Sequence, residues 1–296
     1  MLRFQMIRSW WGKSVSHASC LFSRFLSGKT IVVTSGKGGV GKTTTVASMS
    51  YGLAERGHKV CAVDFDIGLR NLDLHLGMER RVVFDFVHVI HGDCKLHQAL
   101  IKDRRNPNLS LLAASQTRDK TALTVEGVEK VLDELREQFD YIVCDSPAGI
   151  EHGAYQAMYF ADEAIICTNP ELSSVRDSDK MIGLISSRSK RAELNASPTR
   201  CMLLLTRYQP EKVREGTMIS VDDIAEMLGI PLIGVIPETS EVLEATNIGD
   251  PVIMGSPDKP GAGSYRDFVA RYLGEDVSFR FLEPAKRGIF ARLFGK

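Results

Sequence analysis

The stretch at residues 36–43 is Gly36-Lys37-Gly38-Gly39-Val40-Gly41-Lys42-Thr43. It follows the apolar run Ile31 to Val33, which predicts a buried strand, and it leads into a predicted helix from Thr43 to Glu55. A glycine-rich turn in this position lets backbone N–H groups curl around phosphate oxygens at a helix N-terminus. The pattern G-x-x-x-x-G-K-[ST] therefore predicts a nucleotide-binding phosphate loop.

The loop motif also predicts roles for individual residues. We expect Lys42 to reach the β- and γ-phosphates and the Thr43 hydroxyl to ligate Mg²⁺, and we include Thr44 among the nucleotide-binding residues. Lys37 is unusual, because a plain phosphate loop needs no lysine there. It could point away from its own nucleotide and reach a phosphate held by a neighbouring subunit, or it could be a solvated loop lysine. The sequence has no N/T-K-x-D segment for reading guanine, so we favour ATP over GTP.

Length and composition favour one α/β enzyme domain. The chain has 296 residues, of which 44% are hydrophobic and 25% charged, enough for one large core. Its 37 basic and 37 acidic residues balance, so no specific nucleic-acid partner is indicated. The six cysteines lack C-x-x-C spacing, and Cys61, Cys144 and Cys167 fall in apolar runs, so we expect buried thiols rather than a metal or redox site. No apolar run is long enough to span a bilayer.

The first 27 residues differ in composition from the rest. No acidic residue occurs before Glu55, and the opening segment is rich in serine and in bulky apolar residues. Its basic residues are Arg3, Arg8, Lys13 and Arg24. This composition is typical of an organellar transit peptide, although its helical amphipathicity is imperfect. We expect import into the mitochondrial matrix rather than the plastid stroma, with import absent as the remaining alternative, and processing near residues 24–27.

Strand and helix patterns alternate along the rest of the chain. Apolar runs predict strands at residues 59–64, 109–113, 141–145, 163–167, 202–206 and 232–236. Helical patterns cover residues 124–139, 173–190 and 221–228. The fold class is therefore α/β: a single P-loop NTPase domain with a mainly parallel twisted sheet and helices on both faces. Ligands bind such sheets beyond the carboxyl ends of the strands, where the loop, residues 64–66, residues 145–149 and residues 206–208 should converge.

Three aspartates follow predicted strands and suit a metal-assisted reaction. Asp145 ends an apolar strand and fits the acid that holds Mg²⁺, mainly through water. Asp64 and Asp66 follow another strand; we assign Asp64 to the metal and Asp66 to the attacking water. The alternative for this pair is a structural role in capping a strand–helix turn. Such chemistry requires positioning and charge neutralisation rather than a covalent nucleophile, so we expect Lys37, Lys42 and Asp66 to act in catalysis.

The C-terminal segment predicts a second function. Its basic residues are Arg280, Lys286, Arg287, Arg292 and Lys296, against the single acid Glu283. On a helix, four apolar side chains share an arc of about 140°, and these are Ile289, Phe290, Leu293 and Phe294. A short basic amphipathic helix can lie in an anionic membrane interface. One such helix binds weakly and two on a dimer bind with avidity, although a tail packed on its own core is the alternative.

Several motifs together resemble one family. They are GKGGVGKTT at the loop, FDIGLRNLDL at 65–74, ERRVVFDFVHVI at 79–90, ASQTRDK at 114–120, CDSPAGIE at 144–151, YFADEAI at 159–165, SSVRDSD at 173–179, LLLTRY at 203–208, GVIPE at 234–238 and GIFARLFGK at 288–296. Over about residues 29–296 the chain resembles the MinD family of division-site ATPases, within the deviant Walker A group that includes the ParA partition ATPases.

The resemblance implies further properties. It implies an ATP-dependent homodimer in which Lys37 crosses to the partner's nucleotide, Asp66 in the first switch, Asp145 in the Walker B position, and Arg207 and Pro237 at the nucleotide. It implies MinC- and MinE-like partners, with residues 173–179 at the contact helix, and indirect action on the assembly of an FtsZ ring. The basic leader departs from the bacterial pattern and places this action in an organelle, on the inner membrane.

Two other functions remain open at this stage. A ParA-like DNA-partitioning ATPase would show a basic face for DNA and lack the amphipathic tail. An Mrp-like iron–sulfur carrier would need paired cysteines. We expect three segments: a transit peptide at 1–27, the ATPase domain at 28–278, and a linker with the membrane-targeting helix at 279–296.

Overall fold

The computed structural model describes residues 28–119, 122–149 and 152–283. Its sheet has eight strands in the order β3-β4-β2-β5-β1-β6-β7-β8. Their bounds are β1 Lys29–Thr34, β2 Val60–Asp64, β3 Ile101–Lys102, β4 Leu109–Leu112, β5 Tyr141–Asp145, β6 Glu163–Thr168, β7 Arg200–Tyr208 and β8 Leu232–Pro237. All neighbouring strands pair in parallel except β3, which pairs antiparallel with β4. The prediction of a mainly parallel sheet is confirmed.

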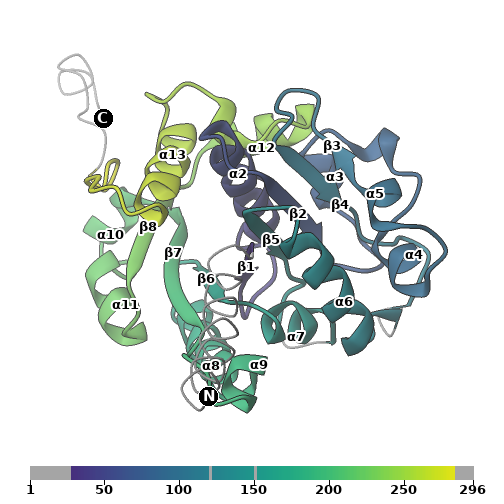
Figure 1. Ribbon diagram of the computed structural model, residues 1–296. Coiled ribbons are helices and arrows are strands. Elements are labelled where there is room, and N and C mark those ends of the chain that lie inside the picture. Colours follow the sequence, from purple (N-terminus) through teal and green to yellow (C-terminus); the bar gives the residue numbers. More distant parts are fainter. Residues whose placement is uncertain (1–27, 120–121, 150–151, 284–296) are drawn as a thin grey trace, which may run out of the picture.

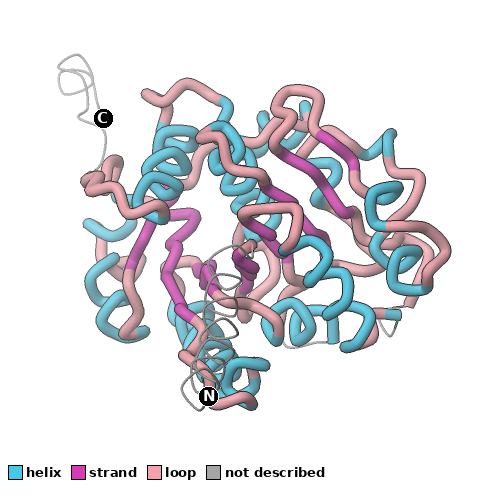
Figure 2. Tube along the Cα trace, viewed as in Figure 1, coloured by secondary structure: helices cyan, strands magenta, loops and turns pink. Residues whose placement is uncertain are grey.

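Helices lie on both faces of this sheet (Figure 1). Their bounds are α2 Lys42–Glu55, α3 Leu72–His75, α4 Phe86–His91, α5 Leu96–Ala99, α6 Val125–Arg136, α7 His152–Tyr159, α8 Leu172–Arg188, α9 Lys190–Glu193, α10 Pro210–Arg214, α11 Val221–Leu228, α12 Ser240–Ile248 and α13 Pro260–Tyr272, with short 3-10 turns η1 at Glu79–Arg81 and η3 at Val252–Met254. Figure 2 shows the resulting alternation of strands and helices along the chain.

Strand β1 shows why the core has two halves. Its side chains alternate between the faces, so Ile31 and Val33 pack in one cluster with α2 and α13, while Val32 packs in the other with α6 and α7. Ile31, Val32 and Val33 have no exposed surface, so both faces at the centre of β1 are buried. The centre of the strand is therefore apolar, as the centres of buried parallel strands are.

Helix α6 shows how local sequence sets an element. The Thr124 side chain caps its first turn by accepting a hydrogen bond from the Gly127 N–H. The buried residues follow the spacing of one helical stripe, namely Val128, Val131, Leu132 and Leu135. The stripe packs onto the face of the sheet that carries Val32. The predicted helix at 124–139 is confirmed, with a shorter C-terminal end.

Three predicted thiols are buried as expected: Cys61, Cys144 and Cys167 have no exposed surface. Burial raises the pKa of each of these thiols above its ordinary value. They are therefore held as neutral core residues. Within the described residues, no helix combines the length and apolar character needed to cross a membrane.

Candidate functional site: the carboxyl edge of the sheet

The loop between β1 and α2 has the backbone of a phosphate-binding turn. Gly41, the last residue before α2, has φ of 91°, a left-handed conformation in which other residues are strained. Gly36 is required for a different reason, since a Cβ there would lie 2.4 Å from the Cβ of Asp177 on α8. The loop is thus held close to α8 at one end and opens onto the N-terminus of α2 at the other.

Lys42 lies at the start of α2 and is buried, with 8% of its surface exposed. Its Nζ donates a hydrogen bond to Ser35 Oγ at 3.0 Å, and that hydroxyl donates to the Lys37 carbonyl at 2.6 Å. Ser35 therefore orients the ammonium group and ties together the two ends of the loop. Ser35 was not predicted, because its role depends on a contact across seven residues.

Asp145 ends β5 beside the loop and is 2% exposed. It accepts a hydrogen bond from the Thr43 side chain, yet burial raises its pKa to about 7 against the opposing effect of Lys42. Its Oδ1 atom is buried and has no hydrogen-bond partner among the residues that the structure describes. A buried carboxylate oxygen left unpaired next to a threonine hydroxyl is a donor set that suits a hard cation such as Mg²⁺.

Asp64 and Asp66 take different positions after β2. The two oxygens of Asp64 accept hydrogen bonds from the backbone N–H of Asp66 at 2.9 Å and of Leu72 at 3.3 Å. Burial, followed by the nearby Asp145, raises the pKa of Asp64 well above its usual range. Asp64 thus fixes the loop that carries Asp66, and the Asp66 side chain lies at the cavity itself.

These groups surround one cavity of about 540 Å³ at the carboxyl edge of the sheet. Its lining residues are Gly38, Gly39, Gly41, Lys42, Thr43, Thr44, Asp66, Leu69, Asn71, His75, Ser146, Pro147, Ala148 and Arg207. The predicted convergence of the loop with residues 64–66, 145–149 and 206–208 is therefore confirmed. Leu69, Asn71 and His75 were not predicted, since the short helix α3 gives no clear pattern in the sequence.

Other predicted site residues do not line this cavity. Lys37 points to Glu171, before α8, and forms an ion pair of 2.7 Å with both side chains substantially exposed. Gly36, Val40, Asp64, Asp145 and Pro237 are also outside the lining. Thr206 Oγ1 donates to the Val40 carbonyl at 2.7 Å, which anchors the loop to the end of β7. Arg207, next to it, has φ of 54° and reaches the cavity.

Two predicted segments lie outside the described residues: the leader at 1–27 and the apolar arc formed by Ile289, Phe290, Leu293 and Phe294. The described chain before that arc is well anchored. Arg280 donates to both carboxylate oxygens of Asp267 on α13, at 2.6 and 2.8 Å. Residues 279–282, which we expected to begin a linker, are thus packed on the domain.

The chain is similar to known proteins over most of its length. A family described as an AAA domain matches residues 28–196. The septum site-determining protein MinD of Escherichia coli strain K12 is 60% identical over 268 residues, covering 90% of this chain and 99% of the relative.

Two solved structures extend the match. MinD in the Aquifex aeolicus MinC:MinD complex has a TM-score of 0.75 and 38% identity, covering 88% of this chain and 99% of its own. MinD of Pyrococcus horikoshii, complexed with Mg-ADP, has a TM-score of 0.72 and 31% identity over 83% of this chain and 96% of its own. The chain belongs to the MinD family of septum site-determining P-loop ATPases.

Proposed function

We propose that the cavity at the carboxyl edge binds ATP with Mg²⁺ and hydrolyses it. The loop N–H groups and Lys42 bind the β- and γ-phosphates, while Thr43 and Asp145 hold the metal, Asp145 mainly through water. The bound Mg²⁺ neutralises phosphate charge during transfer. The observation that carries this proposal is the buried, unpaired Oδ1 of Asp145 beside Thr43. The Mg-ADP complex of the Pyrococcus horikoshii relative supports it.

Two side chains are assigned to orientation within this site. Asp66 reaches the cavity on a loop fixed by Asp64 and orients the attacking water. Asp64 acts on the metal side of the site indirectly, by holding the loop that carries Asp66. Both of its oxygens are engaged by backbone N–H groups. Arg207 lies at the cavity margin and contacts the base, with Pro237 close to the same end of the sheet.

ATP binding controls pairing of two copies of the chain. Lys37 supports this part of the proposal, because its side chain is exposed and turned away from its own cavity. It can therefore reach a nucleotide on a second copy. Replacing Lys37 by Ala is expected to abolish the doubling of mass that ATP causes in light scattering. Lys59→Ala, at an exposed position on the opposite edge, serves as the control and should dimerise normally. An ATP-dependent dimer of the Lys37 variant would contradict the crossing role.

The C-terminal segment attaches the dimer to an anionic membrane through Ile289, Phe290, Leu293 and Phe294. One tail, with its four apolar side chains partly inserted, binds the membrane weakly, whereas the two tails of a dimer bind with avidity. A chain ending at Glu283 should still bind ATP but should not sediment with vesicles containing phosphatidylglycerol. Vesicles of phosphatidylcholine alone are the control for the electrostatic part. Equal sedimentation of the full and shortened chains would exclude the membrane role.

In the cell, this cycle positions a division site. The MinC:MinD complex of Aquifex aeolicus supports a MinC-like partner, and we extend this to a MinE-like protein and to indirect control of FtsZ assembly. The acid-free leader supports action inside an organelle, the mitochondrion before the plastid. A fluorescent fusion with and without residues 1–27 tests this part. Identical distribution of the two fusions would remove the targeting role.

A further inference from the structure

The surface formed by α10, α11 and the turn between them has an incompletely covered apolar strip. We call it the α10–α11 surface. Four half-buried residues pack there against the buried Ile224 and Leu228, namely Val213, Met218, Ile219 and Val221. On α11, the exposed side carries the acids Asp222, Asp223 and Glu226, together with Met227, which is 49% exposed. An acidic face bordering an apolar strip suits a partner that is both basic and apolar.

The described chain ends at this same surface. Leu282 packs against the cluster that contains Ile224 and Leu228, and its carbonyl accepts a hydrogen bond of 3.4 Å from the Tyr208 hydroxyl. Asp222 is in the first turn of α11, and burial first and Asp222 second raise the pKa of Tyr208. The end of β7, the start of α11 and the root of the tail therefore meet. Figure 1 shows the chain after α13 returning past β8 toward α10.

The remaining 13 residues, 284–296, have the complementary composition. They contain Lys286, Arg287, Arg292 and Lys296 and no acidic residue. Ile289 is six positions after Glu283, a reach of about 20 Å when extended, whereas an eight-residue helix is only about 12 Å long. The tail can thus place its apolar arc and its cations anywhere on the α10–α11 surface. The basic Lys212 and Arg214 are on α10, so the favourable charges are those of α11.

We propose that residues 284–296 dock on the α10–α11 surface of a single subunit, with their cations against Asp222, Asp223 and Glu226. The inference rests on the proposed membrane role of the tail, because it makes this surface and anionic lipid compete for one segment. A docked tail keeps a lone subunit off the membrane. Exposed ion pairs are weak and screened by salt, so the surface of an anionic vesicle can displace the contact.

The first experiment uses a fluorescent peptide of residues 284–296 and a chain that ends at Glu283. Anisotropy at low salt should show binding that weakens about fivefold when Asp222→Asn and Glu226→Gln are combined, a loss expected for two exposed charge pairs. Asp223 is left unchanged because it hydrogen bonds with Ser220, which caps α11. The control combines Glu126→Gln and Glu134→Gln, two exposed acids of α6, and should bind the peptide like the unmodified shortened chain.

Three outcomes would overturn docking in this experiment. They are no binding at millimolar chain, equal weakening by the α6 pair, or a shortened chain that doubles its mass through the α10–α11 surface. The last outcome would assign the surface to a second copy of the protein.

The second experiment uses the full chain with ADP and vesicles containing phosphatidylglycerol. The α11 pair of substitutions should raise the sedimented fraction about threefold over the unmodified chain, because the tail is released. The α6 pair, with the same change of net charge, should leave it unchanged; an equal rise would overturn the proposal. The chain ending at Glu283 separates the two ideas. If, with ATP, it sediments like the full chain, the membrane role fails; if it sediments less than the full chain with ATP and the α11 pair has no effect with ADP, only docking fails.

Discussion

Each edge of the sheet carries a polar depression, and the two depressions are built in opposite ways. The depression at the amino edge has about 1360 Å³, and the one at the carboxyl edge has about 540 Å³. The larger one is lined by charged side chains bonded to one another. The smaller one is lined by loop glycines, a buried lysine and Asp66. Beside it, one carboxylate oxygen of the buried Asp145 is left unpaired.

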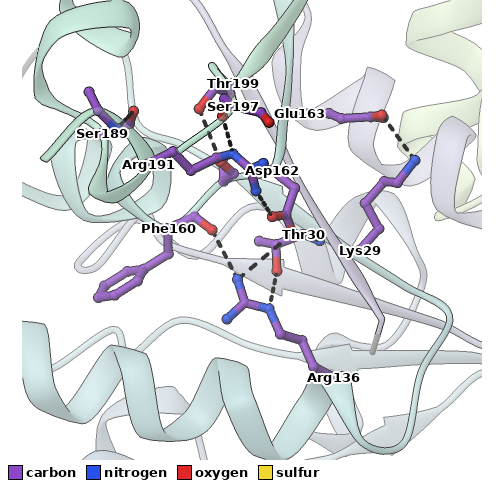
Figure 3. Close-up of polar contacts among 12 residues, drawn as sticks. Lys29, Thr30, Arg136, Phe160, Asp162, Glu163, Ser189, Arg191, Ser197 and Thr199 are labelled. Atoms are coloured by element: carbon purple, nitrogen blue, oxygen red, sulfur yellow. Dashed lines mark hydrogen bonds and ion pairs between the residues drawn. The ribbon is translucent and has the colours of Figure 1, made fainter. Parts of the chain in front are cut away.

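Figure 3 shows the pairing at the amino edge. Arg136 donates to Thr30 Oγ1 at 3.1 Å, to Asp133 at 2.8 Å and to the Phe160 carbonyl at 3.0 Å. Asp162 accepts from Arg191 at 2.8 Å, and Glu163 accepts from Lys29 at 2.9 Å. These groups join α6, β1, β6 and α9 and satisfy each other. At the carboxyl edge, the unpaired oxygen of the buried Asp145, rather than the size of the depression, is the feature that suits a ligand.

The largest effect is expected from removing a lysine at the carboxyl edge. Lys42→Ala should lower ATP affinity at least 100-fold, because a buried charge-assisted contact to phosphate is lost. Lys29→Ala removes a lysine from the amino edge and should change ATP affinity less than twofold. Isothermal titration calorimetry on the two variants measures both values. Similar losses for the two lysines would erase the functional difference between the edges.

Substitution of Asp66 tests whether the carboxyl edge also carries out ATP hydrolysis. Asp66→Asn should lower the rate of ATP hydrolysis about 100-fold, since positioned proton acceptors typically contribute 10²–10⁴. ATP affinity should remain within a few-fold, because Asp66 contacts water rather than phosphate in the proposed arrangement. Phosphate release under saturating ATP is the measurement. A variant that hydrolyses ATP normally would leave Asp66 with the structural role of a turn residue.

Substitutions at the amino edge should change the stability of the protein rather than its affinity for ATP. Arg136→Ala removes three hydrogen bonds from a side chain that is 19% exposed, and should lower the free energy of unfolding by about 2–3 kcal/mol. Lys29→Ala breaks a more exposed pair and should cost less than about 1 kcal/mol. Urea unfolding gives both values. If the Arg136 variant instead kept full stability and lost ATP affinity, the division of roles between the edges would be wrong.

The sequence predicted the parts of this molecule that depend on local pattern. The apolar runs located the central strands, and the glycine-rich loop located Lys42 and Thr43 at the cavity. Topology then placed Asp66 and Arg207 nearby, because the carboxyl ends of parallel strands share one edge. These residues could be predicted because the loop motif and the order of the strands can both be recognised in the sequence.

Features that depend on distant contacts were missed. Helix α13 begins Pro260-Gly261-Ala262-Gly263, a poor helical sequence, and it forms because Tyr265 and Phe268 are buried in the core. Strand β3 has only two residues and exists through its pairing with β4. The network around Arg136 gave no sequence pattern, since its partners lie as far as 106 residues away. Such elements form through tertiary packing, even though the local sequence does not favour them.

The smallest expected effect is on the free energy of unfolding, which the buried carboxylate of Asp145 lowers when no Mg²⁺ is bound. Its pKa is raised from an ordinary carboxyl value to about 7 by burial, with Asp66 adding to the rise and Lys42 and Thr43 opposing it. A raised pKa means that stability without nucleotide is lost as pH increases between about 4 and 7. Asp145→Asn should therefore raise the free energy of unfolding by about 1 kcal/mol at pH 8, a shift in Tm of about 2–4 °C.

At pH 5 that gain should shrink, because the native carboxyl is then protonated as well. The same variant should lose most of the additional stability that Mg²⁺ with ATP gives the unmodified chain, since the anionic oxygen is gone. Thermal unfolding at both pH values, with and without Mg²⁺ and ATP, measures the four quantities. Lower stability of the variant at pH 8 without nucleotide would show that Asp145 is a structural group like those of the amino edge, and the contrast between the edges would fail at its central residue.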